Sequence, residues 1–357
     1  MKYAGDNLIM GVNLTPIIVK DKVPLNVFRG KSLAVEANNM LYQFLSVIRL
    51  DSGIPLQDSK GRSTSDLGDL VFRSTRLICD YDIKLVFVFD GELPKLKLEE
   101  LKRRSLIRFE AKKEWEKAVA SGDRKRAFSK AVTSTRLTRD MVEDAKKLLR
   151  LLGIPYVESP GEGKAQAAHM AEMGRVWAAN SIDYDSILFG APRLARHVTI
   201  SGSKYLQSKR ISRKLVPEII YLAKFLDTLR INQEQLIDLA ILVGTDYNMG
   251  VRGIGPKTAL RLIREHRCLE RLPSEIGGQI PDNIEEIRKL FKEPKVRDDY
   301  STNFTSLDEE GLRRFLVEER DYAEKRVNTI IAHMKKFYST RKQLGLYYFF
   351  DRKNEGR

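Results

Sequence analysis

Four acidic residues stand at the ends of three short apolar runs in this sequence: Glu36, Asp90, Asp183 and Asp185. Helical patterns separate the runs, and each run suits a strand that is buried on both faces. We therefore expect an α/β fold, with a mostly parallel central sheet flanked by helices. Open α/β sheets bind ligands beyond the carboxyl ends of their strands. Four carboxylates at such ends predict a metal site, although any one of them alone would also suit a helix cap.

The predicted helices between these strands cover residues 39–50, 69–81 and 138–152. The last of them stops at Gly153, because glycine adopts the left-handed backbone that closes many helices. Residues 154–160 then predict a further strand.

Residues 95–139 differ in character, with few large apolar side chains and many cations. They predict one or two polar helices with a break near Ser121, Gly122 and Asp123. One interpretation is a solvated helical hairpin held by ion pairs along its helices. The other is a mobile basic arch that touches phosphates. The position favours the arch, because the segment starts five residues after Asp90.

The net charge indicates a polyanionic partner. The 357 residues include 63 Lys and Arg against 48 Asp and Glu, which gives a formal net charge of +15. Each phosphate that a cationic protein neutralises releases counterions, so nucleic acid is the favoured partner. General solubility, or the charge-rich composition of thermophilic proteins, is the alternative explanation.

Cysteine content and hydropathy argue against several other classes of protein. Cys79 and Cys268 are the two cysteines, and they form no Cys-x-x-Cys pair, so a disulfide framework or a structural zinc site is not expected. No run of about 20 apolar residues occurs. The first ten residues lack the apolar core of a signal peptide. We expect a cytoplasmic protein with no membrane partner.

The segment after residue 230 has a helical pattern interrupted by glycine. Gly253 and Gly255, followed by Pro256 and Lys257, form a Gly-x-Gly turn at the start of a helix. Such a turn leaves backbone N–H groups free to hold a phosphate. In a basic chain, residues 236–275 therefore predict a helix–hairpin–helix that grips duplex DNA without reading its base sequence.

The C-terminal residues 341–357 carry the pattern Q-x-x-L-x-x-F-F, formed by Gln343, Leu346, Phe349 and Phe350. Exposed aromatic side chains on a polar terminus are costly unless something buries them. The spacing favours a one-turn 3₁₀ helix that fills an apolar pocket of a partner. Docking on the protein's own core is the alternative.

These segments together resemble the flap endonucleases, a family of XPG-type structure-specific 5′ nucleases, and archaeal members in particular. The resemblance runs from Met10 to Asp351 and is carried by the motifs VFVFDG, ESPGEG, DYDSILFGAPRLARH, ILVGTDYN and RGIGPKTAL. It implies cleavage of 5′ flaps where single-stranded DNA meets duplex, with two divalent metal ions, Mg²⁺ or Mn²⁺. It also implies docking on a sliding clamp of the proliferating-cell nuclear antigen type, in replication and repair.

The expected organisation follows from this resemblance. An N-terminal extension (1–10) precedes a nuclease core (11–340), which holds the helical arch (95–139) and the helix–hairpin–helix (236–275). A clamp-binding tail (341–357) follows. We expect the protein to be a monomer.

The resemblance also implies roles for single residues. Lys97 and Arg104 match the basic pair that the family's arch brings to the scissile phosphate. Tyr42 matches a tyrosine on which a DNA base stacks, and Gly11 matches the glycine near the family's N-terminus. The family's cage of seven metal-binding acids corresponds to Glu36 (an aspartate in the family), Asp90, Glu162, Lys164 (a glutamate in the family), Asp183, Asp185 and Asp246.

Lys164 is the main departure from the family pattern. An ammonium about 4 Å from a dication is repelled by roughly 8 kcal/mol at an effective dielectric constant of 20. Because Glu36 and Lys164 fall in the half of the cage with Asp90 and Glu162, we expect that metal site to weaken and the other to survive. Alternatively, Lys164 replaces part of the missing metal's charge as a fixed cation. The sequence leaves both interpretations open.

Two functions remain. The first is a structure-specific 5′ flap endonuclease, which the five unaltered acids of the cage favour. The second is a weak or inactive paralogue that holds branched DNA and the clamp without cutting, which Lys164 and Glu36 favour. A metabolic α/β enzyme would need a cofactor fingerprint such as G-x-G-x-x-G after the first strand, and the sequence has none there. We predict the endonuclease.

Overall fold

The computed structural model describes residues 11–47, 49–50, 53–199, 202–206 and 211–354. Its centre is a seven-stranded sheet in the order β1-β9-β6-β5-β2-β3-β4. Neighbouring strands are parallel, except that β9 runs antiparallel to both β1 and β6. The strands are β1 (Asp21–Lys22), β2 (Ser32–Glu36), β3 (Lys84–Phe89), β4 (Tyr156–Glu158), β5 (Ala178–Asn180), β6 (Arg193–Arg196) and β9 (Glu218–Tyr221). The predicted α/β fold with a mostly parallel sheet is confirmed.

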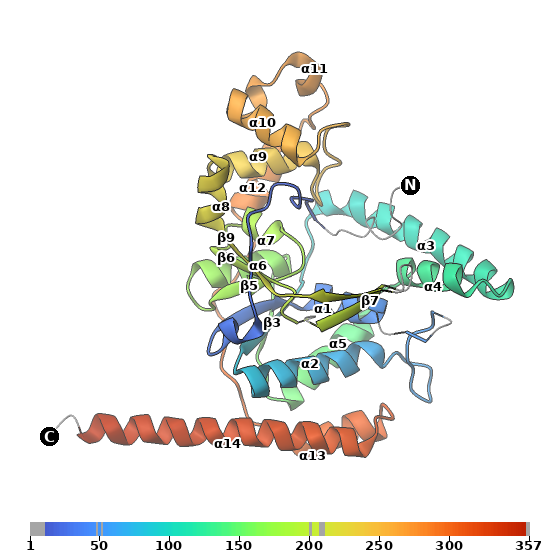
Figure 1. Cartoon of the computed structure of the whole chain (residues 1–357), viewed down its shortest axis with the longest axis vertical. Helices are drawn as coiled ribbons and strands as arrows, with labels where there is room; N and C mark the ends of the chain where they lie inside the picture. Colours follow the sequence, from blue (N-terminus) through green and yellow to red (C-terminus); the bar gives the residue numbers. More distant parts are fainter. Residues whose placement is uncertain (1–10, 48, 51–52, 200–201, 207–210, 355–357) are drawn as a thin grey trace.

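Helices cover both faces of this sheet (Figure 1). The apolar core on one face includes residues of α1 (Ala37–Val47), α2 (Ser65–Tyr81), α5 (Arg139–Leu151), α13 (Glu309–Arg313) and the first turns of α14 (Glu324–Asn354). The core on the other face includes residues of α6 (Gly163–Glu172), α7 (Asp185–Leu188) and α8 (Leu222–Leu229), and it extends through α9 (Gln233–Val243) to α10 (Pro256–His266) and α12 (Ile284–Lys292). The short elements are η1 (Leu25–Phe28), η2 (Lys95–Lys97), η4 (Leu269–Arg271), α11 (Ser274–Gly277), the π-helical η5 (Arg314–Glu318) and a separate hairpin of β7 (Gly202–Leu206) and β8 (Ile211–Leu215).

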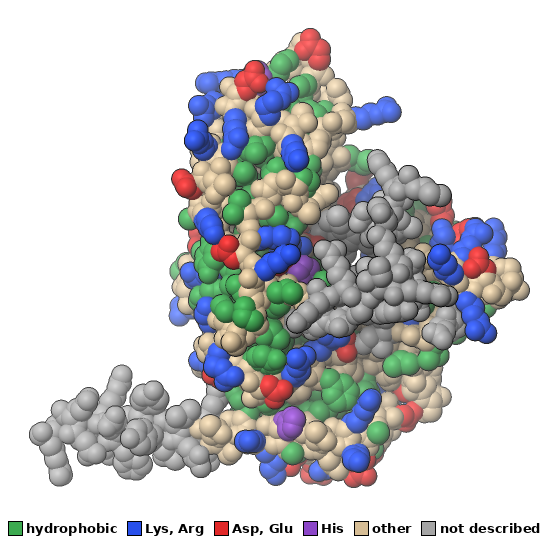
Figure 2. Space-filling view, viewed as in Figure 1, with side chains coloured by type: hydrophobic (Ala, Val, Ile, Leu, Met, Phe, Trp, Pro, Cys, Tyr) green, Lys and Arg blue, Asp and Glu red, His purple; other side chains and the backbone are tan. Residues whose placement is uncertain are grey.

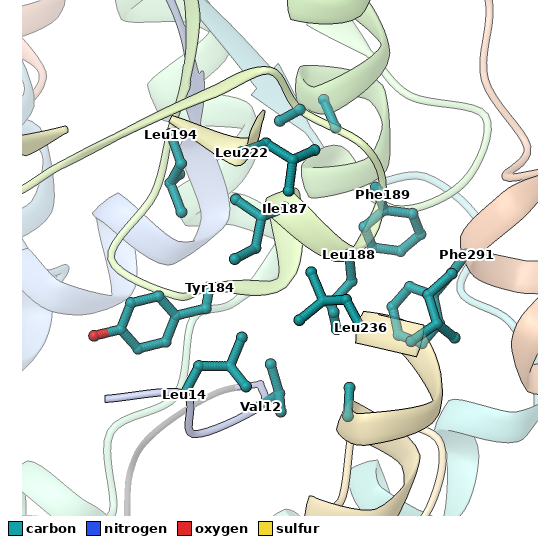
Figure 3. Packing of buried hydrophobic residues seen from close by; sticks show 14 of the residues in the cluster. Val12, Leu14, Tyr184, Ile187, Leu188, Phe189, Leu194, Leu222, Leu236 and Phe291 are labelled. Carbon is teal, nitrogen blue, oxygen red and sulfur yellow. The ribbon is translucent and has the colours of Figure 1, made fainter. Parts of the chain in front are cut away.

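The central strands are apolar throughout because their side chains alternate between two cores. In β2, Leu33 and Val35 join one core, whereas Ala34 joins the other. Figure 3 shows part of the second core, in which Val12 and Leu14 of the N-terminal segment lie near α7. This packing fixes the N-terminal segment beside the carboxyl ends of the strands.

The predicted helices are present with slightly different bounds. Residues 39–50, 69–81 and 138–152 correspond to α1, α2 and α5. Gly153 follows α5 with a φ of +69°, in the left-handed region that favours glycine. Residues 154–160 contain β4, as predicted.

The basic segment 95–139 forms a helical hairpin that projects from the body of the molecule (Figure 1). It consists of α3 (Leu98–Ala120) and α4 (Arg124–Thr133), so the predicted break at residues 121–123 is confirmed. Gly122 has a φ of +72°, and the Asp123 side chain caps α4 by accepting a hydrogen bond from the backbone N–H of Arg126. Small alanine side chains are buried in both helices, so little apolar surface is needed to hold the hairpin.

The C-terminal tail is α-helical in the chain alone, because residues 343–350 lie within α14, which runs to Asn354. The one-turn 3₁₀ helix in a partner's pocket stays a prediction. Extending an existing helix adds one hydrogen bond for each residue fixed, which favours continuation over a new 3₁₀ turn. The C-terminal part of α14 extends beyond the rest of the molecule (Figure 1).

Two parts of the predicted organisation lie outside the described residues. They are the extension 1–10 and the side chains of the clamp pattern, Gln343, Leu346, Phe349 and Phe350. Within the part that is described, no helix combines the length and apolar character required to cross a membrane.

Candidate active site

The predicted acids reach one region from separate elements, because β2, β3 and β5 are parallel neighbours whose carboxyl ends share one edge of the sheet. The positions are the last residue of β2, the residue after β3, the N-cap of α6, a residue in the turn after β5, the first residue of α7 and a residue in the turn after α9. They hold Glu36, Asp90, Glu162, Asp183, Asp185 and Asp246. Three of these acids, Glu162, Asp185 and Asp246, contact lysine or arginine side chains directly. The other three lie close enough to interact electrostatically with the same cluster.

Lys164 lies in the middle of this cluster, which we call the acidic cage. Its ammonium donates a hydrogen bond to Asp185 and another, of 2.8 Å, to Asp246, and it lies 3.3 Å from Glu162. Only 5% of the surface of Lys164 is exposed. Burial opposes the charge, but Asp185, Asp246 and Glu162 outweigh burial and hold the pKa of Lys164 well above its ordinary value. The lysine is therefore a cation inside the cage.

Two further cations reach the cage from the base of the arch. Lys97, in η2, lies 2.9 Å from Glu162 and 3.1 Å from Asp246. Arg104, in α3, donates a 2.6 Å hydrogen bond to Asp246 and a 2.7 Å bond to Glu100. The basic pair predicted for the scissile phosphate thus contacts the acids of the cage in this structure.

Glu162, Asp185 and Asp246 have both carboxylate oxygens engaged by the protein itself. Tyr247 donates a 2.7 Å hydrogen bond to the second oxygen of Glu162, and the backbone N–H of Val12 donates one of 2.9 Å to Asp185. Burial would raise the pKa of Glu162 and of Asp246, yet the nearby cations, Lys164 foremost, hold both pKa values below their ordinary range. We call these three acids the neutralised side of the cage.

Glu36, Asp90 and Asp183 form the open side of the cage. Each accepts one hydrogen bond: from Ser181, from the backbone N–H of Gly163 at 2.6 Å, and from Asn39 at 2.6 Å, respectively. Within the described part of the chain, the other oxygen of each carboxylate accepts none. Burial raises the pKa of Glu36 to about 7, with repulsion from Asp90 adding to the effect.

Burial also raises the pKa of Asp183 well above its usual value, and Glu36 adds to it. The carboxylates of the open side therefore repel one another, which is the environment that a bound cation relieves.

Gly11 lies against the cage, where the resemblance placed it. Its φ of +96° and the position of its Cα leave no room for a side chain, since a Cβ there would lie 2.4 Å from both carboxylate oxygens of Asp185. The glycine thus lets the backbone approach Asp185 closely enough for Val12 to donate its hydrogen bond.

Tyr42 lies in α1 and is buried, with 7% of its surface exposed. The guanidinium of Arg108, from the arch, lies 5.6 Å from the centre of the Tyr42 ring. The predicted stacking of a DNA base on Tyr42 therefore requires Arg108 to leave this position, and it stays a prediction.

The glycine turn between α9 and α10 faces outward. Gly253 has a φ of +81°, Gly255 is the N-cap of α10, and a Cβ on either would meet no atom within 4 Å. Lys257 and Arg261 on α10 are exposed. Figure 2 shows Lys and Arg side chains gathered over this part of the molecule. An exposed helix start of this kind suits a phosphate, and the N–H of Ile254, between the two glycines, donates to the carbonyl of Val251.

Two further residues of the cage are not among those predicted from the sequence. Asn39 donates to Asp183, and Tyr247 donates to Glu162. The signals were available: Asn39 lies one helical turn after Glu36, and Tyr247 directly follows Asp246. Their polar groups hold individual carboxylates in place.

Comparison with known proteins identifies the class. The family model of the XPG N-terminal domain matches residues 10–111, and that of the XPG I-region matches residues 153–246. Both matches include acids of the cage. The chain is therefore an XPG-type nuclease.

Individual relatives narrow the class further. Flap endonuclease 1 of Pyrococcus furiosus is 44% identical over 344 residues, which cover 96% of this chain and 100% of the relative. That of Hyperthermus butylicus is 44% identical over 337 residues, 92% of this chain and 95% of the relative. The solved structure of flap endonuclease-1 from Methanococcus jannaschii superposes with a TM-score of 0.74 at 38% identity, covering 93% of this chain and 100% of that one. The chain belongs to the flap endonuclease 1 family.

More distant structures share the fold. Human GEN1 in complex with Holliday junction DNA has a TM-score of 0.67 at 22% identity, covering 93% of this chain and 79% of that one. The catalytic core of Rad2 with a DNA substrate has a TM-score of 0.65 at 22% identity, covering 88% of this chain and 96% of that one.

Flap endonucleases are metal-dependent, and the two sides of the cage differ in how well they fit a divalent ion. Among the residues that the structure describes, no three acidic, histidine or cysteine side chains stand in positions that could hold a metal ion. The open side has three carboxylates, each with one oxygen that accepts no hydrogen bond from the described residues. Oxygen ligands of this kind suit Mg²⁺, so the chemistry of the open side fits one divalent ion. The neutralised side does not fit a second ion, because Lys164 lies among its oxygens.

Proposed function

We propose that this nuclease cleaves 5′ flaps at the junction of single-stranded and duplex DNA, and that it does so in replication and repair. The observation that carries the proposal is the contact of Lys97 and Arg104, at the base of the arch, with Glu162 and Asp246, two of the six carboxylates of the cage. Acids that hold a divalent ion and cations that hold a phosphate are the two requirements of metal-assisted phosphodiester hydrolysis. As a member of the flap endonuclease 1 family, the chain is a metal-dependent structure-specific nuclease.

The arch cations receive the scissile phosphate in this proposal. Lys97 and Arg104 now pair with carboxylates, and a phosphate entering the cage offers them a second anion at the same place. Arg104 presents a planar fork that binds two phosphate oxygens at once, whereas Lys97 acts as a point charge.

The metal is proposed to be Mg²⁺, with Mn²⁺ as a substitute, held by Glu36, Asp90 and Asp183. When bound, it would supply positive charge to the phosphate and a source of hydroxide near neutral pH. Asn39 and Ser181 orient two of these carboxylates through the hydrogen bonds described above.

Duplex DNA is proposed to bind the outward turn between α9 and α10. The N–H groups beside Gly253 and Gly255, with the charge of Lys257, suit a phosphate of the backbone and carry no base preference. Two structures that share the fold, Rad2 and GEN1, are described in complex with DNA. The tail residues Gln343, Leu346, Phe349 and Phe350 are proposed to bind a sliding clamp.

The test is a cleavage assay with a 5′-flap duplex, a matching plain duplex and a single strand, each labelled at the 5′ end. We expect cuts at the flap junction in Mg²⁺ or Mn²⁺, and little cutting of the other two. Lys97→Ala and Arg104→Ala should each lower the rate by about 10²-fold or more, since each removes a charge from the phosphate site. Lys289→Ala, on the exposed surface of α12, is the matched control and should cut at the wild-type rate.

A wild-type protein that binds the flap tightly but leaves it uncut in both metals would reject the proposal. That result would support the non-cutting binder of branched DNA instead.

A further inference from the structure

Lys164 occupies a position that its own helix does not explain. It is the second residue of α6, and a cation in the first turn of a helix faces the positive end of the helix dipole. The cost is offset by three carboxylates from three separate elements: Glu162, Asp185 and Asp246. The site around Lys164 is therefore built for a cation.

The Lys164 side chain reaches a different part of the cage from the one predicted from the sequence. Lys164 was assigned to the half of the cage with Asp90 and Glu162, and the half with Asp183, Asp185 and Asp246 was expected to remain intact. In the structure the ammonium contacts Asp185 and Asp246. The long side chain crosses the cage, so the weakened metal site is on the neutralised side.

The position of the buried ammonium supports one divalent ion rather than two. Lys164 contacts Glu162, Asp185 and Asp246. A second ion held by these three acids would therefore bring a dication against a buried ammonium. Repulsion between those two charges is large at any effective dielectric constant suited to a buried site.

We propose that the Lys164 ammonium takes the place of one of the two divalent ions, so that the cage holds a single exchangeable metal ion together with a covalently tethered cation. This proposal rests on the proposed function, because the tethered charge is useful where a phosphate is hydrolysed. The ammonium adds positive charge on the neutralised side of the cage, and it cannot be lost to a chelator.

The test counts bound ions rather than cleavage. Wild-type protein, Lys164→Glu and Lys164→Gln are dialysed against Mn²⁺, and the bound metal is measured by elemental analysis and by calorimetric titration. Lys289→Glu makes the same charge change on the exposed face of α12 and is the matched control. Circular dichroism confirms that each variant is folded.

We expect one Mn²⁺ per wild-type chain and per Lys289→Glu chain. Lys164→Glu should bind a second ion at least about a hundredfold more tightly than wild type, because it exchanges a repelling charge for a ligand. The affinity of Lys164→Gln for a second ion should lie between those of wild type and Lys164→Glu. If Lys164→Glu does not fold, the affinity of Lys164→Gln tests the proposal. Two ions of similar affinity in wild type would overturn the proposal.

The same preparations are assayed for flap cleavage, which separates the two proposals. Two bound ions with normal cleavage reject the role of Lys164 and leave the proposed function standing. One bound ion without cleavage rejects the proposed function and leaves the ion count standing.

Discussion

Replacing Gly11 with alanine is expected to disable the cage without removing any of its charges. The new Cβ would lie 2.4 Å from both carboxylate oxygens of Asp185. Cβ atoms in proteins essentially never lie closer than 3.0 Å to a heavy atom of this kind. Asp185 must therefore move by at least about 0.6 Å, the difference between these two distances. The hydrogen bond from the backbone of Val12 to Asp185 would be strained by the same movement.

The expected magnitude has two parts. Alanine at a positive φ costs about 1–2 kcal/mol of folding stability, whatever surrounds it. The displaced carboxylate is the second part, since a misplacement approaching 1 Å in a catalytic site can lower the rate by about 10²-fold. Gly11→Ala should thus be modestly less stable than wild type and about 10²-fold slower in flap cleavage.

Gly30→Ala is the matched control for this experiment. Gly30 has a φ of +73°, so alanine is strained there too, but its Cβ would meet no atom within 4 Å. Urea unfolding should show a similar loss of stability in both variants, whereas single-turnover cleavage should fall in Gly11→Ala alone. Equal cleavage rates in the two variants would refute the reasoning that links Gly11 to Asp185.

Three other measurements test separate features. Burial raises the pKa of Asp66 from 3.8 to about 6, so its contribution to stability is present below about pH 4 and is lost as the pH rises through about 6. Wild type should therefore lose about 2 kcal/mol more unfolding free energy than Asp66→Asn between about pH 4 and pH 7, and parallel pH profiles would contradict this. Lys257→Gln should reduce the slope of log affinity against log salt by about 1 for every duplex sequence, as fluorescence anisotropy would show; an unchanged slope means that Lys257 contacts no phosphate. Phe349→Ala with Phe350→Ala should strongly weaken binding to a sliding clamp in calorimetry and leave DNA affinity unchanged, because aromatic anchors dominate small interfaces. Unchanged clamp affinity would instead indicate that the tail has another role.

The positions of the acids could be predicted because they depend on the backbone alone. The apolar runs before Glu36 and Asp90 fix where β2 and β3 end, and parallel strands end at the same edge. The break in the arch at Gly122 was predictable for a similar reason, since local backbone preferences decide it.

The direction of long side chains could not be predicted in this way. Lys164 has a flexible four-carbon stem, and the choice between Asp90 and Asp185 as its partner depends on the packing of α6 against α7. The cover of Arg108 over Tyr42 likewise depends on how the arch folds back toward α1. The helical state of the tail was missed because its Q-x-x-L-x-x-F-F pattern was considered apart from the helix that precedes it.

The cations inside the cage also affect how far folding depends on the binding of a metal ion. Many metal sites assemble only with their ion, because ligands that repel one another oppose folding until the ion arrives. Here Lys97, Arg104 and Lys164 already neutralise three of the carboxylates. The neutralised side of the cage can therefore form while the chain folds, before any ion arrives. Only the open side, whose three carboxylates still repel one another, gains stability when the ion binds.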